Sequence, residues 1–99
     1  MGKLKTTPFD VADYLRTPKQ RASYLEVVIE ETDGDPFYVA KALSTIARSE
    51  GMTQVARKSG LSRESLYKAL SGTRDPGFST IHKVMTALGL QFHVVAKPL

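Results

Sequence analysis

Apolar residues recur every three or four positions along most of this chain, which is the spacing of amphipathic helices. A first long helix is expected to begin near Thr17, which can cap it, because Pro18 suits the first turn and Gln20 can complete a capping box. This helix ends before Gly34, and a shorter helical turn over residues 9–15 precedes it. Its predicted inward side chains are Tyr24, Leu25, Val28 and Ile29.

A second long helix is expected next. Asp35-Pro36 repeats the start signal, and Gly51 supplies the stop. Its predicted inward side chains are Phe37, Val39, Ala40, Leu43, Ile46 and Ala47.

Three shorter helices are expected in the second half of the chain. The first covers residues 52–59, and Gly60 follows it as a turn. Ser62 can cap the second of these helices, which Gly72 ends. Gly77 can cap the third, which carries Phe78, Ile81, Val84, Met85 and Leu88 and is closed by Gly89.

Residues 91–96 alternate and are rich in aromatic and β-branched side chains, a pattern that predicts a strand. A single strand has no partner in an otherwise helical chain. It must stay unpaired, pack as a coil, or pair with a copy of itself across a two-fold axis. The last arrangement would bring Phe92 and Val94 into a shared core, which makes these residues the candidate dimer contacts.

The expected fold is therefore all-α, with five to six helices, a central helix-turn-helix and a short C-terminal β-strand that pairs across a dimer. We expect one compact domain in three parts. Residues 1–35 form an N-terminal arm and helix, residues 36–90 a DNA-binding core, and residues 91–99 the dimerising strand.

Composition narrows the class of protein. Apolar residues make up 41% of the 99 residues and charged residues 24%, which is typical of a globular chain. The sequence has no cysteine, which excludes a disulfide framework, a thiolate zinc site and a cysteine nucleophile, and it fits a cytoplasmic location. No apolar run approaches the roughly 20 residues that span a bilayer, so no membrane association is expected.

The net charge of +4 is unevenly distributed. Residues 1–50 carry seven Lys or Arg and eight Asp or Glu, which gives −1, whereas residues 51–99 carry seven and two, which gives +5. A basic half of this kind suggests a polyanionic partner, and nucleic acid is the commonest one.

Residues 52–71 satisfy several requirements of a helix-turn-helix at once. Ala56 is small where the two helices touch, and Gly60 tolerates the positive φ of the turn. Ser59 stands where an apolar contact is usual. The apolar anchors to the core would be Val55, Leu61, Leu66 and Ala69. An αα-hairpin without a ligand is the structural alternative.

In a helix-turn-helix the second helix lies in the major groove of double-stranded DNA and the first crosses the backbone. The candidate base-reading residues are Arg63, Glu64, Tyr67, Lys68 and Ser71. The candidate phosphate contacts are Thr53, Gln54, Arg57, Ser62 and Arg74. Arg63 suits a guanine, whose O6 and N7 accept a bidentate guanidinium. Alternatively, Glu64 only favours the first helical turn, and Tyr67 is half-buried packing.

Residues 52–89 resemble an Xre/Cro-type helix-turn-helix domain, including the stretch Pro76-Gly-Phe-Ser-Thr80 and Ala87-Leu-Gly89. The segment before Val55 is shorter than in that family, so its glutamine phosphate contact maps onto either Thr53 or Gln54. Nearly the whole chain resembles the addiction-module antidote proteins (HigA-like antitoxins). The stretches that carry this likeness are residues 9–15, 24–26, 42–43, 46–48, 51–54 and 60–70.

The second resemblance implies two functions. The protein would neutralise a small basic toxin, typically of the RelE/ParE superfamily, and would repress its own operon by binding operator DNA as a homodimer. The acidic cluster at the end of the first long helix is one candidate toxin surface, although such a run is also typical of a solvated helix end. The segment of residues 3–15, whose aromatic side chains offer anchors, is a second candidate. The candidate toxin contacts are Phe9, Tyr14, Glu26 and Glu30.

The sequence gives less support to other classes of function, such as an enzyme. The two histidines, His82 and His93, lie on different elements, and the chain has no Gly-rich phosphate loop or paired carboxylates with a plausible base. We therefore expect no catalytic residues, no metal and no cofactor. A stand-alone Xre/Cro-type repressor without a toxin and a pure protein-interaction module remain alternatives.

Overall fold

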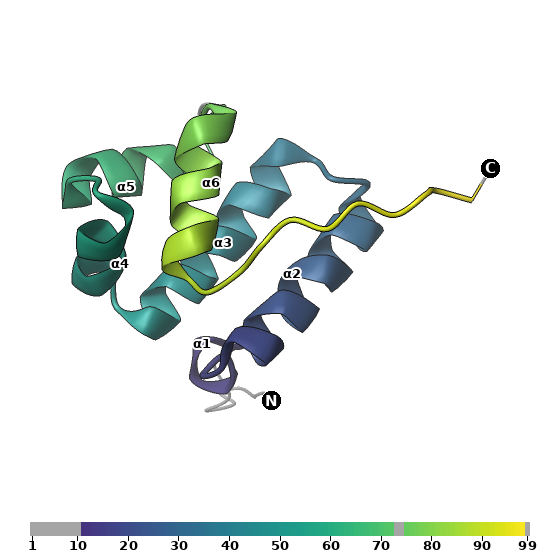
Figure 1. Ribbon diagram of the computed structural model, residues 1–99, viewed down its shortest axis with the longest axis horizontal. Helices are drawn as coiled ribbons and strands as arrows, with labels where there is room; N and C mark the ends of the chain where they lie inside the picture. Colours follow the sequence, from purple (N-terminus) through teal and green to yellow (C-terminus); the bar gives the residue numbers. More distant parts are fainter. Residues whose placement is uncertain (1–10, 73–74, 99) are drawn as a thin grey trace, which may run out of the picture.

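The computed structural model describes residues 11–72 and 75–98, and six α-helices make up its regular structure (Figure 1). This confirms the predicted helical class. In chain order the helices are α1 (Val11–Tyr14), α2 (Pro18–Thr32), α3 (Pro36–Glu50), α4 (Met52–Ser59), α5 (Arg63–Ala69) and α6 (Phe78–Ala87).

Local capping sets the starts of the long helices. The Thr17 side chain accepts a hydrogen bond of 3.1 Å from the backbone N–H of Gln20, whose side chain accepts one of 3.1 Å from the N–H of Thr17. Both halves of the predicted capping box are thus present. Asp35 accepts a bond of 2.9 Å from the N–H of Phe37 at the start of α3. These starts follow directly from the sequence.

Helix α3 joins the two halves of the molecule. It packs against α1 and α2 on one side and contacts α4, while α4 also packs against α5 and α6. A single apolar core runs through all of these contacts. The largest fully buried side chains are Leu15, Leu43, Ile46, Val55, Leu66, Val84 and Leu88.

The predicted C-terminal β-strand is wrong. Residues 91–98 form no regular secondary structure and run as an extended segment along the α2–α3 side of the fold (Figure 1). The Phe92 ring lies 5.2 Å from that of Phe78 on α6, and the Lys97 ammonium pairs with Asp33 at 2.7 Å. Side-chain contacts with its own domain therefore position the segment, and the pairing strand of the predicted dimer is not seen.

Some predicted inward positions face solvent. Ile29 and Phe37 are exposed, and Phe78 is 70% exposed at the start of α6. Conversely, Ala42 and the charged Arg21 are buried. Helical spacing identified the correct stripes, but the neighbouring helices decide how wide each buried stripe is.

In the part of the chain that the structure describes, no helix is long and apolar enough to cross a membrane.

Candidate nucleic-acid interface

The turn between α4 and α5 is built by local hydrogen bonds. Gly60 adopts the left-handed region at φ 78°, which glycine enters without strain. Its N–H and that of Leu61 both donate to the carbonyl of Ala56, at 3.0 and 3.1 Å. Buried Ser59 is also satisfied, because its hydroxyl donates to the Ala56 carbonyl at 3.2 Å and accepts from the Leu61 N–H at 3.4 Å. A polar residue is therefore tolerated where an apolar one was expected.

One face of each helix in this pair anchors it to the core. Val55 and Ala56 of α4 and Leu66 and Ala69 of α5 are buried, as predicted, and Leu61 is partly buried against the same core. The opposite faces of both helices stay exposed. The α4–turn–α5 unit (residues 52–69) is thus anchored to the core with its polar face outward.

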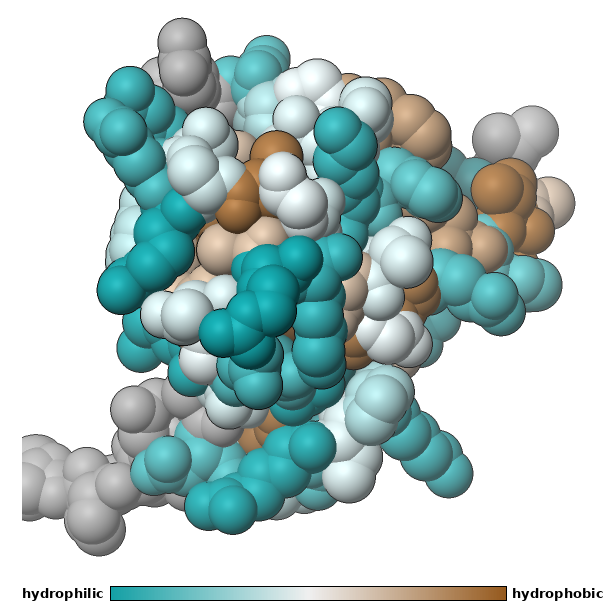
Figure 2. All heavy atoms as spheres, turned by 60° about the vertical axis from the view of Figure 1, so that its left-hand side comes forward, coloured by the Kyte–Doolittle hydropathy of each residue, from teal (hydrophilic) through white to brown (hydrophobic). Residues whose placement is uncertain are grey.

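Four of the five predicted base-reading residues, Arg63, Glu64, Tyr67 and Lys68, lie on α5, and Ser71 follows just after its end; all five are exposed. Figure 2 turns the α4–α5 side forward, and hydrophilic side chains dominate the view. The five side chains do reach solvent together, as base readers would have to.

Two side-chain pairs organise this face. A guanidinium nitrogen of Arg63 donates to the Tyr67 hydroxyl at 3.2 Å, and the guanidinium carbon lies 5.6 Å from the centre of the Tyr67 ring. Lys68 and Glu64 approach to 3.6 Å, one helical turn apart. Both members of that second pair are well exposed, so the pair contributes at most a few tenths of a kcal/mol. The first pair thus sets the Arg63 guanidinium beside the Tyr67 ring, and the second pair is weak.

The predicted phosphate residues lie around this face. Thr53, Gln54 and Arg57 are exposed on α4, and Arg57 donates to the Gln54 side chain at 2.6 Å. The Ser62 hydroxyl caps α5 by accepting from the Ser65 N–H at 3.0 Å. Capping the helix is therefore sufficient to explain a serine at position 62. Arg74 lies outside the described residues.

A network of ion pairs that joins α2, α3 and α4 was not predicted from the sequence. Arg21 of α2 donates to Glu50 of α3 at 2.8 Å and to the Leu15 carbonyl at 3.1 Å. Lys58 of α4 donates to the second carboxylate oxygen of Glu50, also at 2.8 Å. The hydrogen bond from Lys58, aided by the charges of Lys58 and Arg21, lowers the pKa of Glu50. Arg21 and Glu50 are 29 residues apart, so no local pattern could have paired them.

The predicted toxin contacts are separate from α5. Tyr14 is exposed on α1, and Glu26 and Glu30 are exposed one turn apart on α2. Phe9 lies outside the described residues. Nearby, Asp33 pairs with Lys97 at 2.7 Å, and the hydrogen bond from Lys97 lowers the pKa of Asp33. One carboxylate at the acidic end of α2 therefore has a cationic partner from the C-terminal segment.

The predicted dimer residues lie on the C-terminal segment. Phe92 stacks near His82, with ring centres 6.4 Å apart, as well as near Phe78. Val94 is 92% exposed. Phe92 thus contacts aromatic residues of its own domain, whereas Val94 is left almost fully exposed to solvent.

Comparison with known proteins shows the family to which the chain belongs. The family model described as "Probable addiction module antidote protein" matches residues 5–96. An uncharacterized protein of Haemophilus influenzae is 48% identical over 86 residues, which cover 87% of each chain. No solved structure matches the chain.

The family description states a role, because an antidote in an addiction module acts against a toxin. It therefore assigns this chain an antitoxin role and a toxin as its partner. The match spans both halves of the fold, from the segment before α1 to the C-terminal segment. This chain belongs to the family of probable addiction module antidote proteins.

Proposed function

We propose that this antidote protein neutralises a RelE/ParE-superfamily toxin and also represses its own operon by binding operator DNA as a dimer. The observation that supports the DNA-binding part is the exposed face of α5, with Arg63 held against Tyr67 and Lys68 beside them. The buried opposite face gives this helix a fixed orientation on the core. Such a helix fits the major groove, whose base edges specify sequence.

The exposed residues of α4 and α5 take different proposed roles in binding DNA. Arg63 begins α5, and the N-terminal part of a recognition helix lies nearest the bases, so Arg63 donates to guanine O6 and N7. Tyr67 orients Arg63. Gln54 and Arg57 contact the phosphate backbone, which sets register without reading sequence, and Lys68 reaches either the bases or the flanking phosphates.

Replacing Arg63 with alanine tests the base-reading role. We expect Arg63→Ala to weaken operator binding by roughly 1–3 kcal/mol and to relax specificity at one base pair, because the bidentate contact is lost. Mobility shift or fluorescence anisotropy would measure this with the duplex upstream of the reading frame. Arg16→Ala removes the same charge from an exposed site outside α4 and α5 and serves as the control. An equal loss on operator and random DNA would exclude Arg63 as a base reader.

Dimerisation would place two copies of α5 on half-sites about 34 Å, or a multiple of that, apart. We propose that exposed apolar side chains of α6 and the C-terminal segment make this contact. Val94, Val95 and Phe78 are the most exposed of them, and Phe92 lies against Phe78. No strand pairing is needed for such a contact.

The toxin surface is proposed on α1 and α2, where Tyr14, Glu26 and Glu30 face solvent. A basic toxin would meet the two carboxylates of α2. We expect the double charge reversal Glu26→Lys/Glu30→Lys to weaken capture of the small basic protein encoded beside this reading frame at least tenfold, because attraction becomes repulsion. Isothermal titration calorimetry would measure the affinity.

The control for the toxin experiment is Glu64→Lys, which reverses a charge on α5 instead. It should leave toxin affinity unchanged. If the Glu26→Lys/Glu30→Lys variant bound the toxin as tightly as the wild type, the toxin surface would not lie on this face of α2. A stand-alone repressor is the alternative function, and DNA binding with no interaction with the neighbouring gene product would favour it.

A further inference from the structure

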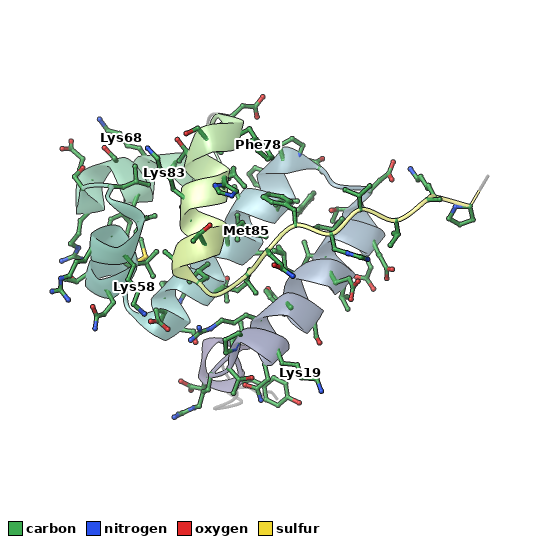
Figure 3. All side chains as sticks on the ribbon, in the orientation of Figure 1. Lys19, Lys58, Lys68, Phe78, Lys83 and Met85 are labelled. Carbon is green, nitrogen blue, oxygen red and sulfur yellow. The ribbon has the colours of Figure 1, made fainter. Side chains whose placement is uncertain are left out.

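Lys58 lies on the α4 side expected to face DNA, yet its ammonium is bound elsewhere. Gln54 and Lys58 are one helical turn apart and both are exposed, so they share one face of α4. Lys58 lies on α4 (Figure 3), and its ammonium donates a hydrogen bond of 2.8 Å to Glu50. This residue was absent from the phosphate contacts predicted from the sequence.

Glu50 binds two cations that differ sharply in their surroundings. The Arg21 side chain is 8% exposed, and it also donates to the Leu15 carbonyl. The Lys58 side chain is 50% exposed. Loss of Arg21 would leave a partly buried carboxylate short of a partner, whereas Lys58 can leave because Arg21 still compensates Glu50. Lys58 is therefore the exchangeable member of the network.

We propose that Lys58 is an exchangeable contact to the DNA backbone, held by Glu50 in the free protein and transferred to a phosphate when the duplex binds. The proposal rests on the DNA-binding function proposed above. A flexible four-carbon stem and a point charge suit such an exchange better than the planar guanidinium of Arg21. Glu50 then competes with the phosphate for one cation, and so lowers affinity for every DNA sequence.

The first test measures the salt dependence of binding. We expect Lys58→Gln to lower the slope of log affinity against log salt by up to about 0.9, on operator and random duplex alike. The ratio of wild-type to variant affinity should therefore change about threefold between 50 and 200 mM salt. Lys58→Arg should preserve the slope. Lys19→Gln removes the same charge from an exposed position on α2, remote from α4 (Figure 3), and is the matched control.

The second test asks whether Glu50 competes directly. Glu50→Gln removes the charge but keeps an oxygen that accepts from Arg21, and we expect it to raise DNA affinity. In the Lys58→Gln background the same change should give no gain. A gain of equal size in both backgrounds would show that Glu50 acts through long-range charge and would overturn the exchange.

The outcomes separate the two proposals. If the wild-type protein binds no duplex even at 50 mM salt, the DNA-binding function fails. If it binds, but Lys58→Gln leaves the salt slope unchanged, the exchange fails and DNA binding stands. Circular dichroism melting confirms that each variant is folded at the assay temperature. Should Glu50→Gln not fold, the comparison of Lys58→Gln with Lys58→Arg still decides whether Lys58 transfers to a phosphate when DNA binds.

Discussion

Replacing Leu66 with alanine should destabilise the protein by about 2–5 kcal/mol, because the surrounding helices cannot fully close the cavity. Leu66 is completely buried and is the apolar residue at the centre of α5, so its loss also loosens the proposed recognition helix. For a chain of this size the melting temperature should fall by at least about 8 °C. Thermal denaturation followed by circular dichroism measures this effect.

The adjacent residue provides the control for Leu66. Tyr67 is 49% exposed on the other face of the same helix, so Tyr67→Ala should change stability by no more than about 0.5 kcal/mol. Its effect should appear in DNA affinity instead, because Arg63 loses its hydrogen-bond and ring partner. If the two variants were equally unstable, the orientation assigned to α5 would be wrong.

Replacing Glu50 with alanine should cost about 3 kcal/mol, because it leaves the guanidinium of Arg21 without its carboxylate in a mostly buried position. In that variant, Arg21 keeps its hydrogen bond to the backbone carbonyl of Leu15. Urea denaturation gives the free energy of unfolding. Lys58→Ala removes the exposed cation from the same carboxylate and should cost under about 1 kcal/mol. Equal costs for the two variants would contradict the different roles of Arg21 and Lys58.

The contribution of Glu50 to the free energy of unfolding should depend on pH. The folded-state pKa of Glu50 lies below its ordinary value of 4.5, chiefly because Lys58 donates a hydrogen bond to the carboxylate. A carboxyl with a lowered pKa stabilises the fold fully above its unfolded pKa, and this stabilisation is lost as pH falls through the folded pKa. The stability gap between the wild type and Glu50→Ala should therefore be widest near neutral pH and should narrow below about pH 4.5.

Much of the candidate site could be predicted because its signals are local. The Thr17–Gln20 capping box, the Asp35 cap and the left-handed turn at Gly60 each involve atoms only a few residues apart. Helical spacing then placed Leu66 inward, and Arg63 and Lys68 outward, on α5. Regular helical geometry turns such short-range patterns into one buried and one exposed face.

The C-terminal segment shows where local patterns fail. Alternation and β-branched residues favour a strand, but a strand needs a neighbouring strand to bond with. The helical domain offers side-chain contacts instead, through Phe78 to Phe92 and Asp33 to Lys97. Extended backbone therefore forms here without a ladder.

Hydrogen bonds and periodicity within a few residues specify the helices, the tight turn and the polar face of α5, so these features could be predicted from the sequence. Which charges are buried, and which share a partner, depends instead on how the helices pack. Arg21, Glu50 and Lys58 meet because α2, α3 and α4 pack together, and the burial of Arg21 makes Lys58 the cation that can leave. Burial and ion pairing depend on segments distant along the chain, and a local pattern carries no information about them.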